Sequence, residues 1–157
     1  MMAKEMSNTR NRGRIVWVLA SSRPDLIEVD LKRPGRVDTK IPLFPSVTPE
    51  EGFHLIRALC KKQGLDIPKA KFDEFRYIIP DLVTPGAAEA LAVRVYRLVK
   101  TRNVSAEEAL KDCLEDYQNP VPPDVLEFQI NLAVREASDL NFVPKRLLPE
   151  KVKISEI

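Results

Sequence analysis

Helix start signals are the feature of this sequence that most constrains its fold. Thr48 and Thr84 each stand directly before a proline, and Ser105 opens the stretch "SAEE". A hydroxyl side chain at the N-cap accepts a hydrogen bond from the first helical turn, and proline suits the first helical position. A glutamate three residues after the cap completes a capping box. The pattern predicts helices beginning at these residues, with capping boxes closed by Glu51 and Glu108.

Apolar residues recur at helical spacing after each start. Phe53, Ile56 and Cys60 share one face of the first helix, and Gly64 is a natural stop. Asp124 is the expected cap of the last helix, which follows the proline-rich "NPVPP". The sequence predicts a bundle of four or five helices over residues 48–140 that buries its own core. The later helical patterns occupy residues 69–79, 84–103, 105–117 and 124–138.

Two short stretches before Thr48 favour strands. Ile15–Ala20 ("IVWVLA") is fully apolar, which is typical of a strand buried on both faces of a parallel sheet. Val37–Phe44 alternates roughly between apolar and polar residues, and Pro42 places it near a sheet edge. Because an isolated strand pair is only marginally stable, we expect the rest of the sheet to come from outside this sequence.

Composition excludes several classes of protein. The 157 residues are 44% hydrophobic and 31% charged, which indicates a globular chain, and no apolar run approaches the ~20 residues of a membrane span. The single histidine, His54, nearly excludes a His-based metal site or catalytic triad. Cys60 and Cys113 lack metal-ligand spacing, so we expect two reduced core thiols in a cytoplasmic protein.

Charge is unevenly placed along the chain. Residues 1–40 carry nine Lys and Arg against five Asp and Glu, although the whole chain has a net charge of only +2. A basic N-terminal part favours an anionic partner such as nucleic acid, a phosphate group or an acidic protein face. Because the excess is small, we do not expect nucleic acid to be the partner.

One charged stretch carries a family resemblance. The segment "IVWVLASSRPDLIEVDLKRPGRVD" resembles the second half of the AAA+ ATPase core, in its AAA clade. That family has an apolar strand, a small residue, Thr or Ser, Asn and Arg-Pro-Asp, and then a short helix and Arg-Pro-Gly-Arg-Phe-Asp. This chain has Ser21–Ser22, Arg23–Asp25 and Arg33–Asp38 in the same order. The family's helical lid follows at this point, and residues 48–140 are similar to such a lid.

The resemblance implies an α+β, mostly α fold. Two strands would come from the edge of a P-loop-type parallel sheet, and a lid bundle of four to five helices would follow. Residues 1–46 would be the incomplete end of the α/β core, 47–142 the lid, and 143–157 an irregular tail. The sequence contains no G-x-x-x-x-G-K-[ST] phosphate loop and no apolar run ending in Asp-Glu. We therefore expect a C-terminal half-module without ATPase activity of its own.

Three residues match the family's catalytic positions. The resemblance implies that Ser22 is the sensor-1 residue, where the family usually has Asn, and that Arg33 and Arg36 are arginine fingers. A serine hydroxyl is shorter than an Asn side chain, but it can still orient a water or contact a γ-phosphate. Arginine suits a developing phosphoryl charge because its planar fork donates two hydrogen bonds and stays protonated.

The resemblance also implies contacts with ATP. Gly86 and Ala87 match the lid's Gly-Ala segment beside the nucleotide base, and Ser21 lies next to the sensor position. Magnesium and its ligands would come from the missing half of the module, so no metal ligand is predicted in this chain.

The family implies partners as well. We expect a homo-oligomeric ring, usually hexameric in the family, or association with the upstream half, together with a protein substrate and no membrane. Two alternatives stay open: a non-enzymatic helical interaction module derived from a lid, and a DNA-linked AAA+ relative. Convergence of Ser22, Arg33 and Arg36 on one phosphate-sized space would separate the ATPase from the interaction module. Salt-dependent DNA binding would indicate the DNA-linked relative.

Overall fold

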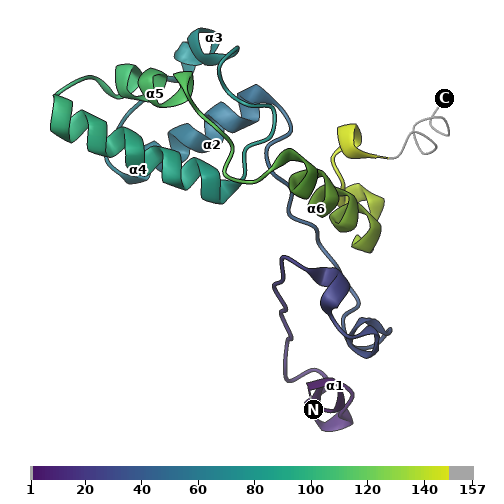
Figure 1. Ribbon diagram of the computed structural model, residues 1–157. Helices are drawn as coiled ribbons and strands as arrows, with labels where there is room; N and C mark the ends of the chain where they lie inside the picture. The colour runs from purple at the N-terminus through teal and green to yellow at the C-terminus, as the bar shows by residue number, and fades with distance from the viewer. Residues whose placement is uncertain (1, 149–157) are drawn as a thin grey trace. The chain divides into compact units, whose positions relative to one another are not determined.

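Helices are the main regular structure in the part of the chain that the structure describes. The computed structural model describes residues 2–148, which form helices joined by irregular segments (Figure 1). The α-helices are α1 (Met2–Met6), α2 (Pro49–Lys62), α3 (Phe72–Phe75), α4 (Pro85–Arg102), α5 (Ala106–Glu115) and α6 (Pro123–Glu136). Short 3-10 turns lie at Thr9–Asn11, Pro24–Leu26, Val29–Lys32, Lys69–Lys71, Leu140–Phe142 and Lys145–Leu147. Most of the predicted tail, residues 149–157, lies outside the described residues.

The two predicted strands, and with them the α+β fold class, are wrong. Within residues 2–148 the only β-pairing is an isolated antiparallel bridge between Ser46 and Val83. The stretch Ile15–Ala20 is exposed rather than buried, with Val16 at 89% and Val18 at 87% relative exposure. Strand propensity reflects packing against neighbouring strands, and the described residues provide no such neighbour for this stretch or for Val37–Phe44.

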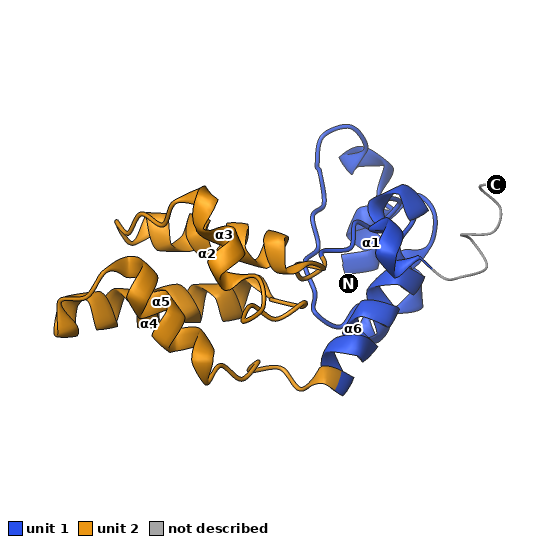
Figure 2. Ribbon diagram, turned by 90° about the horizontal axis from the view of Figure 1, so that it is seen from above, with its two compact units in different colours: residues 1–43, 124–157 blue, residues 44–123 orange. Residues whose placement is uncertain are grey.

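The chain divides into two compact units (Figure 2). One unit is residues 44–123, which contain α2 to α5, and the other combines residues 1–43 with residues 124–157. The fifth predicted helix, α6, therefore belongs with the N-terminal residues and not with the four helices before it. The predicted domain boundaries after residues 46 and 142 remain predictions.

The core of residues 44–123 is built around α4. Both α2 and α5 pack against α4, and Phe53, Leu91 and Leu110 from the three helices are at most 2% exposed. Phe75 of α3 stacks on Phe53, with ring centroids 5.4 Å apart. Each such buried side chain contributes about 1.5–3 kcal/mol relative to an exposed one. This core lies entirely between Phe53 and Tyr117.

The predicted helix starts are confirmed at their caps. Thr48 and Thr84 accept hydrogen bonds from the backbone N–H groups three residues on, at 3.1 and 3.2 Å. Ser105 and Glu108 form a complete capping box. The box predicted at Thr48 differs, because Glu51 accepts from the N–H of Val47 and not from that of Thr48.

The predicted stop of α2 is confirmed, and the predicted cap of α6 is wrong. Gly64 ends α2 with φ +78°. The N–H groups of Gly64 and Leu65 bond the carbonyls of Lys61 and Cys60, which is a Schellman motif. The predicted cap Asp124 is wrong, because α6 already begins at Pro123 and Asp124 lies within its first turn.

Candidate functional site

The predicted finger arginines flank a tight turn. The N–H of Arg36 donates to the carbonyl of Arg33 at 3.2 Å, and Gly35 has φ +84°. Proline followed by a glycine of positive φ is the signature of a type II turn. The Asp38 carboxylate accepts a hydrogen bond from the N–H of Gly35 at 2.6 Å, which is a second hydrogen bond that stabilises the turn. The Pro34–Gly35 pair therefore fixes the direction in which the chain carries both arginines.

Arg33 and Arg36 both contact Asp30. The Arg33 Nε lies 3.2 Å from the Asp30 carboxylate, and the Arg36 Nη1 donates to the Asp30 backbone carbonyl at 2.6 Å. The Arg36 Nε also donates to the Ser7 hydroxyl at 2.7 Å. The Arg33 side chain is 67% exposed, whereas Arg36 is half-buried. Arg33 thus presents the more accessible guanidinium, and Arg36 is held on two sides.

The predicted sensor residue stands apart from these arginines. Ser22 is exposed, and its hydroxyl makes no hydrogen bond to the described residues. The neighbouring Ser21 hydroxyl accepts from the N–H of Arg23 at 3.0 Å. An open pocket beside Arg36 is lined by Ala3, Lys4, Ser7, Asn8, Glu28, Asp30 and Arg36, and neither Ser22 nor Arg33 reaches it. The structure brings the two arginines together but does not join Ser22 to them.

Arg23 forms a separate bidentate pair with Asp25. Its Nε and Nη2 donate to the two carboxylate oxygens at 2.9 and 2.6 Å. The hydrogen bond from Arg23 lowers the pKa of Asp25, and the same bond raises the pKa of Arg23. Asp25 therefore stays ionised near neutral pH and holds Arg23 in one orientation.

Gly86 and Ala87 lie in the other unit, at the start of α4. Gly86 is exposed, and a Cβ added to it would meet no atom within 4 Å. Ala87 is only 4% exposed and packs in the core. Of the two predicted base contacts, Gly86 is therefore the one that faces open space.

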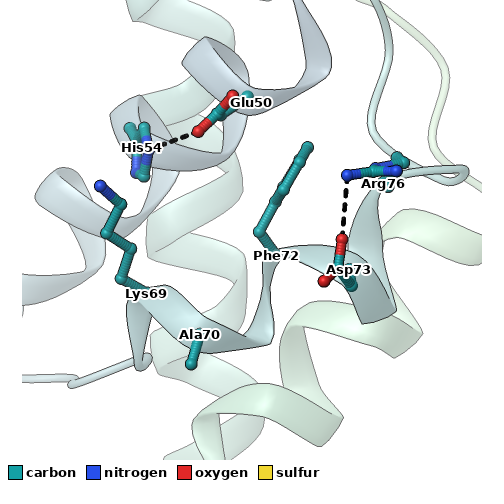
Figure 3. A pocket seen from close by; sticks show the side chains of 7 residues that line it. All are labelled: Glu50, His54, Lys69, Ala70, Phe72, Asp73 and Arg76. Atoms are coloured by element: carbon teal, nitrogen blue, oxygen red, sulfur yellow. Dashed lines mark ion pairs between the residues drawn. The ribbon is translucent and has the colours of Figure 1, made fainter.

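Sequence reasoning missed a pocket between the first turns of α2 and the segment around α3 (Figure 3). Its lining side chains form short-range pairs: His54 lies 3.6 Å from Glu50, and Arg76 lies 3.0 Å from Asp73. The Arg76 guanidinium lies over the Phe72 ring, 5.2 Å from its centroid. The remaining lining residues are Lys69 and Ala70. The only signal in the sequence was that His54 is the single histidine.

Metal and thiol chemistry find no support in the described residues. Between residues 2 and 148 no group of three or more His, Cys, Asp or Glu side chains could hold a metal ion. Cys60 and Cys113 are free and buried, as predicted. Burial raises the pKa of Cys60 to about 11, so its thiol is protonated at neutral pH and unreactive.

The described residues also contain no helix long and apolar enough to cross a membrane.

Comparison with known proteins gives one partial similarity. No family model matches the chain, and no solved structure matches it. A protein named as a ribosome biogenesis ATPase, nvl, from Dictyostelium discoideum is 33% identical over 73 residues. The match covers 44% of this chain and 8% of that relative's length. A part of this chain is therefore similar to a part of a protein that is named as an ATPase.

Proposed function

We propose that this chain is part of an AAA+ ATPase of the AAA clade and supplies one side of a nucleotide site. The observation that carries the proposal is the ordered "SSRPD" and "RPGRVD" segment, which occurs in a chain with partial similarity to an ATPase. The bound nucleotide would be ATP, and the phosphate loop and magnesium ligands would come from outside this sequence.

The arginines act on a neighbour's ATP in this proposal. Arg33 and Arg36 reach the γ-phosphate across a subunit interface of a ring, which is hexameric in most of the family. The type II turn supports this role, because a guanidinium that is fixed before the reaction stabilises developing charge without reorganisation. The Asp30 carboxylate that pairs with Arg33 is itself 55% exposed, so a phosphate can displace it at little cost.

The remaining predicted residues have separate roles in this proposal. In the unit that contains the arginines, Ser22 orients the attacking water, with Ser21 beside it in the sequence. In residues 44–123, the open space at Gly86 suits contact with a nucleotide base, whereas Ala87 is buried. Movement of the helices on nucleotide exchange would then act on a protein substrate in the cytoplasm. The chain alone contributes to hydrolysis without catalysing it.

A mixing experiment tests this function. Subunits in which this sequence follows a phosphate-loop half would be prepared in two forms, one with Arg36→Ala and one with a disabled phosphate loop. Mixed interfaces that pair an intact loop with an intact Arg36 should regain ATP hydrolysis, by up to ~10³-fold over either form alone. Arg14→Ala is the matched control, because Arg14 is exposed in the same unit and makes no ion pair with the described residues. Mixed rings that form but stay inactive at every ratio would refute the trans role of Arg36.

The separation of Ser22 from the arginines favours one alternative. A non-enzymatic interaction module needs no common phosphate site, and the exposed apolar stretch Ile15–Ala20 offers it a contact surface. This alternative predicts that the alanine variants of Ser22, Arg33 and Arg36 leave every partner interaction and every ATPase rate unchanged.

A further inference from the structure

The end of α6 contacts both sides of the arginine turn. Lys32 Nζ lies 2.9 Å from one carboxylate oxygen of Glu136, and Lys40 Nζ lies 3.9 Å from the other. The backbone N–H of Lys40 donates to the Ser138 hydroxyl at 3.1 Å, and the N–H of Ser138 donates to the Lys40 carbonyl at 3.2 Å. Arg33 and Arg36 lie in the stretch between the two lysines. One carboxylate therefore ties both ends of the segment that carries the predicted fingers.

The arginine segment contributes no fully buried side chain. Between residues 7 and 43 the best covered apolar side chains are only half-buried, as at Ile27, Leu31 and Val37. By contrast, α6 buries Leu126, Ile130 and Leu132. A chain segment that buries little apolar surface depends strongly on its polar contacts for its position. The position of the arginine turn thus depends on what α6 provides.

The pair of Lys32 and Glu136 differs from an ordinary surface ion pair. Their side chains are 18% and 26% exposed, and they join positions 104 residues apart in the sequence. Other pairs in the chain, such as Lys71 with Glu74, are exposed and join residues one helical turn apart. Partial burial reduces the screening of the pair by solvent. An ion pair between distant parts of the sequence restrains how two segments pack, whereas a pair within one helix does not.

A cation–π contact also joins the N-terminal segment to α6. The Arg23 guanidinium lies over the Phe128 ring of α6, 5.7 Å from its centroid. Arg23 is already oriented by its bidentate pair with Asp25. Contacts with α6 therefore recur at residues 23, 32 and 40, along the whole length of the segment.

We propose that Glu136 is a positioning residue that braces the arginine turn. Its carboxylate holds Lys32 and Lys40 and thereby restricts where Arg33 and Arg36 can point. The consequence for ATP hydrolysis rests on the proposed function, whereas the brace itself does not.

Hydrogen exchange on the full chain tests the brace without nucleotide. Glu136→Gln keeps the shape of the side chain and removes its charge. We expect amide exchange over residues 28–40 to become roughly fivefold faster, while exchange in residues 44–123 stays unchanged. Glu127→Gln is the matched control, since Glu127 is an exposed residue of the same helix without an ion pair to the described residues. Equal exchange in the two variants would overturn the brace.

A charge exchange separates the pair from other effects of the substitution. Glu136→Lys should speed exchange over residues 28–40, and so should Lys32→Glu combined with Lys40→Glu, because Glu136 faces both lysines. The variant that combines all three substitutions should restore slow exchange. Failure to restore it would show that the three side chains do not act through their opposite charges.

The mixing experiment then supplies the functional readout. In subunits that also carry this chain's intact Arg36, Glu136→Gln should lower the regained ATPase rate severalfold, with Glu127→Gln unchanged. A normal rate despite faster exchange would overturn the positioning role. Unmodified mixtures that regain no activity would refute the proposed function instead, while the exchange data would still judge the brace.

Discussion

Two helical glycines differ in the space around them, although each lies near the start of its helix. A Cβ added to Gly86 in α4 would meet nothing within 4 Å. A Cβ added to Gly52 in α2 would lie 3.2 Å from Ile79 and 3.3 Å from both Ser46 and Val83. Ser46 and Val83 are themselves joined by two hydrogen bonds. Internal packing therefore explains the glycine at position 52 and does not explain the glycine at position 86.

Alanine at the two glycines should give different stabilities. Gly86→Ala should stabilise the chain by up to about 1 kcal/mol, because alanine loses less backbone entropy in a helix and meets no neighbour. Gly52→Ala should gain less or lose stability, since the bonded Ser46–Val83 pair must shift by a few tenths of an ångström. Urea denaturation of both variants measures the difference. A larger gain for Gly52→Ala would contradict the packing described here.

The Cys60 thiol predicts how stability depends on alkaline pH. Burial raises its pKa from 9.0 to about 11, so the folded state holds the proton more tightly than the unfolded state. This contribution is complete below about pH 9 and is lost as the pH rises toward 11. Cys60→Ala should be less stable at pH 8, and its deficit should narrow by pH 10.5. A constant deficit across this range, measured by urea denaturation, would show that the thiol is not protonated by burial.

At the scale of elements, the starts of helices could be predicted from the sequence, and the pairing of strands could not. Thr48, Thr84 and Ser105 start helices because a cap acts within one turn and needs no distant partner. The run Ile15–Ala20 has strand composition, but a strand forms only when another strand lies beside it, and its own sequence cannot report that. The segment around residues 69–79 shows the same limit, because only Phe72–Phe75 is α-helical there.

The capping box of α5 should carry a measurable share of stability. Ser105 accepts from the N–H of Glu108 at 3.2 Å, and Glu108 accepts from the N–H of Ser105 at 3.0 Å. Ser105→Ala removes the first bond and should cost about 1 kcal/mol. Ser138→Ala serves as a comparison outside α5, and thermal unfolding of residues 44–123 should be unaffected by it. An unchanged midpoint for Ser105→Ala would mean that the start of α5 contributes nothing to the bundle.

At the scale of the whole molecule, the contacts of α6 could not be predicted from the sequence. Its helical pattern was predictable, but its contacts with Lys32 and Lys40 are long-range ion pairs that no local pattern encodes. The same holds for the site: the motif located Arg33 and Arg36, and only the structure revealed that Asp30 contacts both. The motif alone suggested a role for Ser22. No contact among the described residues joins its side chain to the two arginines.

The division into units predicts an independently folding fragment. The core from Phe53 to Tyr117 lies wholly inside residues 44–123. A fragment of these residues should therefore unfold cooperatively, with a single thermal transition seen by both circular dichroism and calorimetry. Loss of cooperativity, regained when residues 124–148 are added, would show that α6 belongs to the bundle as the sequence predicted.

The central claim is that this chain supplies arginines to a nucleotide site and does not hydrolyse ATP itself. The most direct measurement is ATP turnover by the purified chain, compared with its Arg36→Ala variant over a range of protein concentrations. The sequence has no phosphate loop to cradle the nucleotide, so both should show no turnover above buffer. Turnover that is robust in the wild-type chain and abolished by Arg36→Ala would contradict the account, because the chain would then contain a complete catalytic site.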